Sequence, residues 1–190
     1  DISINNGLDG IAFEGKEGLT PVAFPEEQKI AITTGGSGSD NTGLNVEKLI
    51  EARSKFGKAD IDLDDPDNEL IIAVTQTQMD DLLRGVDIKN SLYDAMKDLY
   101  TGRTNKFLGF TFVRCNRLTK TTSGDGFSRK CAAWCKSGVI LCIPQEISMD
   151  VSQRKDKNNN WQALAKMKAG STRIEDKKVV QIFCQEEADE

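Results

Sequence analysis

The side chains in this sequence that could carry out chemistry are carboxylates and cysteines, because the 190 residues include no histidine. Histidine is the usual general base near neutral pH and the commonest metal ligand. A serine or cysteine nucleophile would need another base, such as lysine, and no motif supports one. The spacing of the 30 acidic residues singles out no acid–base pair. We therefore expect no catalytic residues and no enzyme activity.

The densest group of carboxylates is an acidic run that begins at Asp60, and it could be taken for a calcium loop. A loop of the EF-hand type needs glycine at its sixth position and glutamate at its twelfth. Counted from Asp60, these positions hold Asp65 and Ile71. The run is therefore predicted to be a solvated turn, and a weak cation site at a contact between subunits is the alternative.

The cysteines and the glycine-rich loop also have simpler interpretations than a bound ligand. Cys131, Cys135 and Cys142 could suggest zinc, but they lie in an apolar run and no histidine is available as a fourth ligand. We expect all five cysteines to be reduced, buried side chains of an intracellular product. The loop GGSGS at 35–39 lacks the lysine and hydroxyl of a phosphate-binding loop. No metal and no cofactor are predicted.

Charge and hydropathy exclude further classes of function. The net charge of −5 and the scattered basic residues argue against nucleic acid as the main ligand. No window approaches 18 consecutive apolar residues, so no membrane-spanning helix is expected. The apolar fraction of 38% is low for a round monomer and predicts an elongated or flat molecule with much polar surface.

The first half of the chain holds the clearest elements. Apolar spacing predicts a helix from about 45 to 57, with Asn45 as its N-cap and Gly57 as its stop. The apolar run 70–74 predicts a buried strand. Further helices are predicted from Thr75 or Thr77 to Gly85 and over 90–100, and a short strand over 29–34.

The second half is predicted to be mostly extended. We expect a strand over 107–113, a polar loop over 119–130, and a strand or strand pair over 132–143 that is broken near 136–138. A turn is expected over 155–160. Residues 161–169 fit a helix by propensity and a strand by alternation, so both remain open. A strand over 178–183 and a frayed acidic tail complete an α+β protein.

Three segments in this order resemble the C-terminal part of the major capsid protein of tailed bacteriophages, a fold shared with encapsulin shells. The first, NVEKLIEARSKFGKADIDLDDPDNELIIAVTQTQMDDLL, is similar to the helix, turn, strand and helix that lead into the axial domain. The second, NKFLGFTFVRCNRL, resembles a strand phrase of that family. The third, CAAWCKSGVILCI followed by WQALAKMKAGSTRIEDKKVVQIFC, resembles the closing strands of its peripheral domain. The resemblance covers about residues 44–184.

The resemblance implies mixed sheets flanked by helices. It implies a connecting segment with part of the peripheral domain over 1–43, a mainly axial domain over 44–145, and closing peripheral strands over 146–190. The family's N-terminal arm, extended loop and spine helix find no counterpart before residue 44, so open apolar surfaces are expected where these would pack. The fragment alone is expected to stay a monomer or small oligomer. The residues expected at subunit contacts are Asp60, Asp62, Asp64, Asp65, Thr119, Lys120, Arg129 and Lys130.

The implied function is that of a structural subunit of an icosahedral phage or prophage-derived shell. Its partners would be copies of itself, in hexamers and pentamers, and packaged double-stranded DNA held only nonspecifically. It would be made in the bacterial host cytoplasm, end in the virion, and have no membrane partner. The alternative is an intracellular α+β adaptor or protein-binding module without catalysis. An open apolar surface favours the shell subunit, and a closed globule with a deep polar pocket would exclude it.

Overall fold

A seven-stranded mixed sheet forms the centre of the computed structural model, which describes residues 11–14, 16–37, 40–59, 61–62, 65, 68–85, 92–123 and 126–186. In order across the sheet lie β3 (Lys29–Ile30), β11 (Val179–Glu186), β8 (Gly126–Cys135), β4 (Leu70–Val74), β6 (Phe110–Arg114) and β5 (Lys106–Phe107), and β7 (Lys120–Ser123) pairs with β8. The pairs β4–β6 and β3–β11 are parallel, and the other pairs are antiparallel.

Among the described residues, three helices flank this sheet: α2 (Val46–Lys58), α3 (Gln76–Arg84) and α4 (Leu92–Thr101). The predicted cap Asn45 is confirmed, since it accepts from the amide of Lys48. Of the two residues offered as the start of the second helix, Thr75 is the cap and accepts from the amide of Gln78. The predicted end of the first helix is one residue too early. Gly57 lies within α2, because α2 continues through Lys58.

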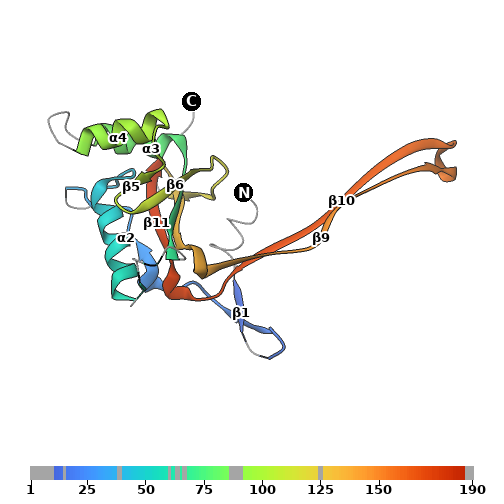
Figure 1. Ribbon diagram of the computed structural model, residues 1–190, viewed down its shortest axis with the longest axis horizontal. Helices are drawn as coiled ribbons and strands as arrows, with labels where there is room; N and C mark the ends of the chain where they lie inside the picture. The colour runs from blue at the N-terminus through green and yellow to red at the C-terminus, as the bar shows by residue number, and fades with distance from the viewer. Residues whose placement is uncertain are drawn as a thin grey trace.

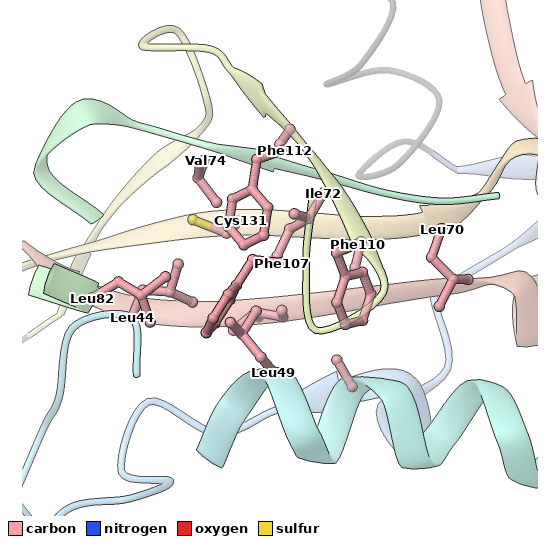
Figure 2. Close-up of a cluster of buried hydrophobic side chains, with 14 of the residues drawn as sticks. Leu44, Leu49, Leu70, Ile72, Val74, Leu82, Phe107, Phe110, Phe112 and Cys131 are labelled. Atoms are coloured by element: carbon pink, nitrogen blue, oxygen red, sulfur yellow. The ribbon is translucent and has the colours of Figure 1, made fainter. Parts of the chain in front are cut away.

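The core lies between the sheet and α2. Figure 2 shows Leu49 on α2 beneath side chains of β4, β5 and β6, among them Ile72, Phe107 and Phe110. The apolar run 70–74 is β4, as predicted, and it is buried because it has a strand on each side. The rings of Phe56 and Phe110 meet at a centroid distance of 6.3 Å, which ties α2 to β6.

Three predicted segments fold differently. The strand expected over 107–113 is a hairpin of β5 and β6, which turns at Leu108 and Gly109 with φ of 50° and 82°. The polar loop expected over 119–130 is also a hairpin, formed by β7 and β8. The strand expected over 29–34 ends at Ile30. Two hairpins therefore stand where a single strand and a loop were expected. Local composition does not reveal which strands pair with each other.

A long hairpin leaves this body and gives the molecule its elongated shape (Figure 1). It is formed by β9 (Val139–Arg154) and β10 (Asn160–Arg173), which pair with each other in a separate sheet. The predicted break after β8 is the short 3-10 turn η3 (Lys136–Gly138). Pairing with β9 makes residues 161–169 a strand rather than a helix. We call β9 and β10 with their connecting turn the long hairpin, and the other described residues the body.

A second, much shorter hairpin lies near the base of the long one (Figure 1). It pairs β1 (Ala12–Glu14) with β2 (Thr20–Val22). Further 3-10 turns are η1 (Glu26–Gln28), η4 (Lys155–Lys157) and η5 (Asp176–Lys178). The mixed sheets flanked by helices confirm the predicted α+β class. Of the acidic tail that was expected to fray, Gln185 and Glu186 belong to β11, and the last four residues lie outside the described ranges.

Candidate interaction surface

The long hairpin is a regular antiparallel ribbon in its outer half. Pairs run from Asn160 opposite Arg154 to Lys166 opposite Ser148 without interruption, and two irregularities follow nearer the body. At about 3.3 Å per residue, a strand of 14 residues reaches roughly 45 Å. The reversal of the chain uses Asn158 and Asn159 with φ of 49° and 57°, a conformation that asparagine tolerates better than most residues. The turn predicted over 155–160 is therefore confirmed.

One side of this ribbon is apolar and exposed. Residues directly opposite each other share a side, so Met149 with Ala165 and Val151 with Ala163 lie on one face. Alternation along each strand adds Ile147, Trp161 and Met167 to it. Gln153, opposite Trp161, is the polar residue on this side. Exposed fractions are 69% for Ile147, 74% for Met149, 62% for Val151 and 72% for Trp161. We call these side chains the apolar face: Ile147, Met149, Val151, Trp161, Ala163, Ala165 and Met167.

The opposite side of the same ribbon is polar. It carries Ser148, Asp150, Ser152, Gln162 and Lys166, with Leu164 as its apolar member. A ribbon with one apolar and one polar side is the pattern of a sheet that packs on a partner through one face. A two-stranded hairpin is at best marginally stable in water by itself. The apolar face therefore needs a covering surface that the described chain does not provide.

The root of the long hairpin is fixed to the body. Arg173 is buried, donates to the carbonyl of Val22 over 2.9 Å and pairs with Asp176. Its guanidinium also lies 5.2 Å from the centre of the Phe24 ring. Beside it, a Cβ on Gly138 would come within 2.6 Å of Lys178 Cβ, so the backbones approach closely there. The base of the hairpin is therefore held to the body by a hydrogen bond, an ion pair and close packing.

A hollow of about 400 Å³ lies at this base, between β1 and the segment that follows β10. Phe13 and Ile174 line it, and both are exposed. Three carboxylates, those of Glu14, Glu175 and Asp176, also line it. Two basic side chains, those of Arg173 and Lys177, line it as well, so the hollow combines exposed apolar side chains with a border of mixed charge.

Inside the body, one lysine is completely buried. The ammonium of Lys48 donates to the carbonyls of Thr42 at 2.8 Å, Gly43 at 2.9 Å, and Ile32 and Phe183 at 3.0 Å. Burial lowers the pKa of Lys48 from its usual 10.5, although four carbonyl acceptors favour the charged form. The side chain joins α2 to β11 and to the segment that precedes α2.

The apolar spacing that predicts this helix did not identify Lys48 as a buried residue. Ile50 is exposed, and Arg53 reaches the carbonyl of Leu108 at the surface. The inner face instead holds Lys48, Leu49, Ala52 and Phe56. The spacing of positions 48, 52 and 56 is a regular helical stripe and was the available signal.

A buried ion pair between Arg129 and Glu186 lies where the end of β11 meets β7, β8 and α3. Arg129 donates to Glu186 at 2.9 and 2.7 Å and to the carbonyl of Leu118 at 2.7 Å. The hydroxyl of Thr75 donates to the other oxygen of Glu186 at 3.1 Å. The charge of Arg129, a residue assigned to a subunit contact, is therefore paired inside the body, and its assignment to a contact stays a prediction.

The remaining residues assigned to subunit contacts lie at two separate places. Asp62 and Asp65 are exposed after α2, while Asp60 and Asp64 lie outside the described residues. Lys120 is exposed on β7, and Thr119 and Lys130 beside it are half-buried. These two places lie apart in the sequence, and neither belongs to the long hairpin. The sequence analysis did not predict the apolar face of that hairpin. Alternation over 147–153 and 161–167, either side of an asparagine-rich turn, was the signal for it.

The cysteines follow the prediction with one exception. Cys115, Cys131, Cys135 and Cys184 are buried thiols, whereas Cys142 is exposed. Cys142 was predicted to be buried because it lies in an apolar run, but that run continues into β9, which leaves the body. Hydrogen bonding with Cys184, together with burial, raises the pKa of the Cys131 thiol well above its usual value, which disfavours the reactive thiolate.

Within the described ranges, no three histidine, cysteine, aspartate or glutamate side chains gather as a metal site would require. No helix in that part of the chain is both long enough and apolar enough to cross a membrane.

Hydrogen bonds from Thr111 and Lys106 lower the pKa of Glu69, and they join the start of β4 to β6 and β5. This group has a structural role, so the apolar face remains the strongest candidate for function.

Comparison with known proteins points in one direction. A sequence model of the family described as phage capsid protein matches residues 1–186. No curated protein matches the sequence significantly. Among solved structures, the capsid of Ralstonia phage GP4 is 12% identical with a TM-score of 0.62, over 94% of this chain and 57% of that chain.

Two further structures are similar. The capsid structure of the cyanophage P-SCSP1u is 13% identical with a TM-score of 0.57, over 90% of this chain and 56% of that one. A structure from Mycobacterium phage Che8 is 16% identical with a TM-score of 0.55, over 74% of this chain and 53% of that one. At such identities the likeness extends to the fold alone. The chain spans a little over half the length of these solved chains.

Proposed function

Since the chain belongs to the phage capsid protein family, we propose that it is a structural subunit of an icosahedral phage or prophage-derived shell. It acts by assembling with copies of itself into hexamers and pentamers that enclose DNA. The observation that carries the proposal is the apolar face of the long hairpin, on which Met149, Val151 and Trp161 are each more than three-fifths exposed. Such a face serves a subunit that is completed by its neighbours.

The role requires no catalytic group, and we propose none. Buried charged side chains such as Lys48 and the Arg129–Glu186 pair have partners within the same chain, as a structural role requires. Contacts with the enclosed double-stranded DNA are nonspecific, since the net charge of −5 offers no strong basic surface. The protein is made in the host cytoplasm, resides in the virion and has no membrane partner.

We propose that residues 44–145 form mainly the axial domain, and that 1–43 and 146–190 contribute the connecting segment and the peripheral domain. The long hairpin is then the main peripheral element. In support, β9 and β10 pair with each other in a sheet of their own. Exposed residues on the body, among them Asp62, Asp65 and Lys120, face neighbouring subunits.

The proposal is tested by locating the protein in particles from its source culture. Particles are separated by density after nuclease treatment, and peptides of the chain are quantified by mass spectrometry in each fraction. We expect the chain to co-sediment with nuclease-protected DNA as one of the most abundant proteins. Recovery only in the soluble fraction, in a stoichiometric complex with a different protein, would contradict the proposal and support the adaptor alternative.

A further inference from the structure

The long hairpin carries most of the excess positive charge of the described residues. Residues 139–173 contain six lysines and arginines and three aspartates and glutamates, a net charge of +3. The described residues of the body contain 18 basic and 17 acidic side chains, a net charge of +1. The long hairpin therefore has the larger excess of positive charge on far fewer residues.

The long hairpin and the body also differ in how their basic side chains are paired. In the body, Lys106 and Lys178 each pair with a nearby carboxylate. In the long hairpin, Arg154 pairs with Asp156 and Arg173 pairs with Asp176. Among the residues that the structure describes, no ion pair involves its four other cations, which are Lys155, Lys157, Lys166 and Lys168. Their ammonium groups are therefore available to an anionic partner.

The four lysines lie on one side of the ribbon and at its end. Lys166 is opposite Ser148, which places both on the polar side, and Lys168 follows on that side by alternation along β10. Lys155 and Lys157 lie in η4, within the connecting turn. All four are exposed, and with β10 extended they span roughly 25 Å.

The acidic residues of the long hairpin reduce this charge without cancelling it. Asp156 is paired with Arg154. Asp150 lies on the polar side opposite Leu164, and Glu146 lies at an irregularity of the strand pairing. Two carboxylates, those of Asp150 and Glu146, therefore stand against the four lysines, and the net charge of +3 already includes them.

The polar side and the apolar face point in opposite directions, because successive side chains of a strand alternate. Any protein surface that covers Met149 and Val151 therefore leaves Lys166 and Lys168 on the far side of the ribbon. Double-stranded DNA carries one negative charge for about every 1.7 Å of its axis. A row of lysines on the uncovered side can therefore meet several phosphates at once.

We propose that the polar side and the turn of the long hairpin contact the phosphates of the enclosed double-stranded DNA through Lys155, Lys157, Lys166 and Lys168. Contacts to phosphate carry no information about base sequence, so the binding is nonspecific. It weakens as salt is added, because each contact releases counterions from the DNA. The inference rests on the proposed shell function and identifies the surface of the subunit that meets the DNA.

The first test compares two double substitutions that remove the same charge. Lys166→Gln with Lys168→Gln changes the polar side of the long hairpin. Lys58→Gln with Lys97→Gln changes exposed positions of α2 and α4 and is the matched control. The affinity of the full chain for a short fluorescent DNA duplex is measured by anisotropy at several salt concentrations, with circular dichroism as the check on folding.

The salt dependence reports the number of phosphate contacts. The logarithm of the affinity falls with the logarithm of the salt concentration, with a slope of about −0.9 for each contact. We therefore expect a slope of about −3.6 for the unchanged chain and for the control, and about −1.8 for Lys166→Gln with Lys168→Gln. Adding Lys155→Gln and Lys157→Gln should remove the remaining salt dependence.

The second test uses intact particles. Lysines are acetylated with a small reagent in particles that hold DNA and in particles that have been emptied of it, and the modified peptides are quantified by mass spectrometry. We expect Lys155, Lys157, Lys166 and Lys168 to react several-fold less in the filled particles than in the empty ones. Lys97, which lies on the body, should react equally in both.

Each other outcome overturns the inference. Equal slopes for the two double variants would mean that only net charge matters and that the long hairpin is not the DNA surface. Protection of the four lysines in filled and empty particles alike would mean that a neighbouring protein covers them, and full reactivity in both would mean that nothing does. Co-sedimentation with nuclease-protected DNA tests the shell function separately, since a chain found there is a shell component whichever surface meets the DNA.

Discussion

The body and the long hairpin use apolar side chains in opposite ways. In the body, Phe110 is completely buried between the sheet and α2, and the buried charges Lys48 and Glu186 have protein partners. In the long hairpin, Trp161 is 72% exposed although it is the larger side chain. The difference indicates that the body's interactions are satisfied within one chain, whereas the hairpin's apolar face is completed only by another surface.

The largest expected difference is between truncations of these two aromatic residues. Phe110→Ala should lower the free energy of unfolding by about 3–5 kcal/mol, because it removes a buried ring and leaves a cavity. Trp161→Ala should change it by less than about 0.5 kcal/mol, because its ring is exposed in the isolated chain. Urea denaturation of both variants at low protein concentration measures the difference. Equal losses would mean that the hairpin packs on the body and that the comparison fails.

The next effect concerns the buried lysine. Lys48→Met keeps most of the aliphatic stem but removes the donor from four buried carbonyls, so we expect a loss of about 3–4 kcal/mol in the free energy of unfolding. Lys58→Met, at an exposed position of the same helix, is the control and should be nearly neutral. A loss below about 1 kcal/mol for Lys48→Met would mean that water satisfies these carbonyls.

A somewhat smaller loss is expected at the end of β11. Glu186→Gln keeps an acceptor for Thr75 but leaves the buried Arg129 without its negative partner, at a cost of about 2–3 kcal/mol. Glu175→Gln removes a carboxylate from an exposed pair near the hairpin root and should cost less than about 0.5 kcal/mol. Thermal denaturation of the two variants compares them. A neutral Glu186→Gln would indicate that Arg129 finds another partner.

The smallest expected effect depends on pH. The pKa of Glu69 is lowered in the folded protein by Thr111 and Lys106, so its contribution to stability is present above its unfolded value near 4.5. That contribution is lost as the pH falls through the lowered folded value. The stability difference between the unchanged chain and Glu69→Gln should therefore shrink as the pH is lowered from neutral into this range. A difference that does not depend on pH would contradict the assignment.

Much of the body could be predicted from local sequence. The caps Asn45 and Thr75 and the apolar run 70–74 are short-range signals, and the helices and strand that they predict are present. Pairing was harder to predict. The turn at Leu108 and Gly109 divides what looked like one strand, because a left-handed backbone conformation at a leucine has no strong local signal.

The long hairpin shows the same limit at a larger scale. The composition WQALAKMKA favours a helix, while its alternation permits a strand, and only the partner strand β9 decides between them. Likewise, Cys142 lies in an apolar run that resembles a core strand, and it is exposed because the strand leaves the body. The exposure of a side chain depends on what packs against it in the folded chain. Residues adjacent in the sequence do not specify that.

By itself, the sequence determined the α+β class, the caps and main helices, and the absence of histidine that argues against common catalysis. These properties depend on residue type and on spacing within a few positions. Only the tertiary structure decided that Lys48 has four carbonyl partners, that Arg129 is used inside the body, and that Trp161 lies on an exposed apolar face. Each of these depends on segments distant in the sequence, whose positions follow from the packing of the whole chain.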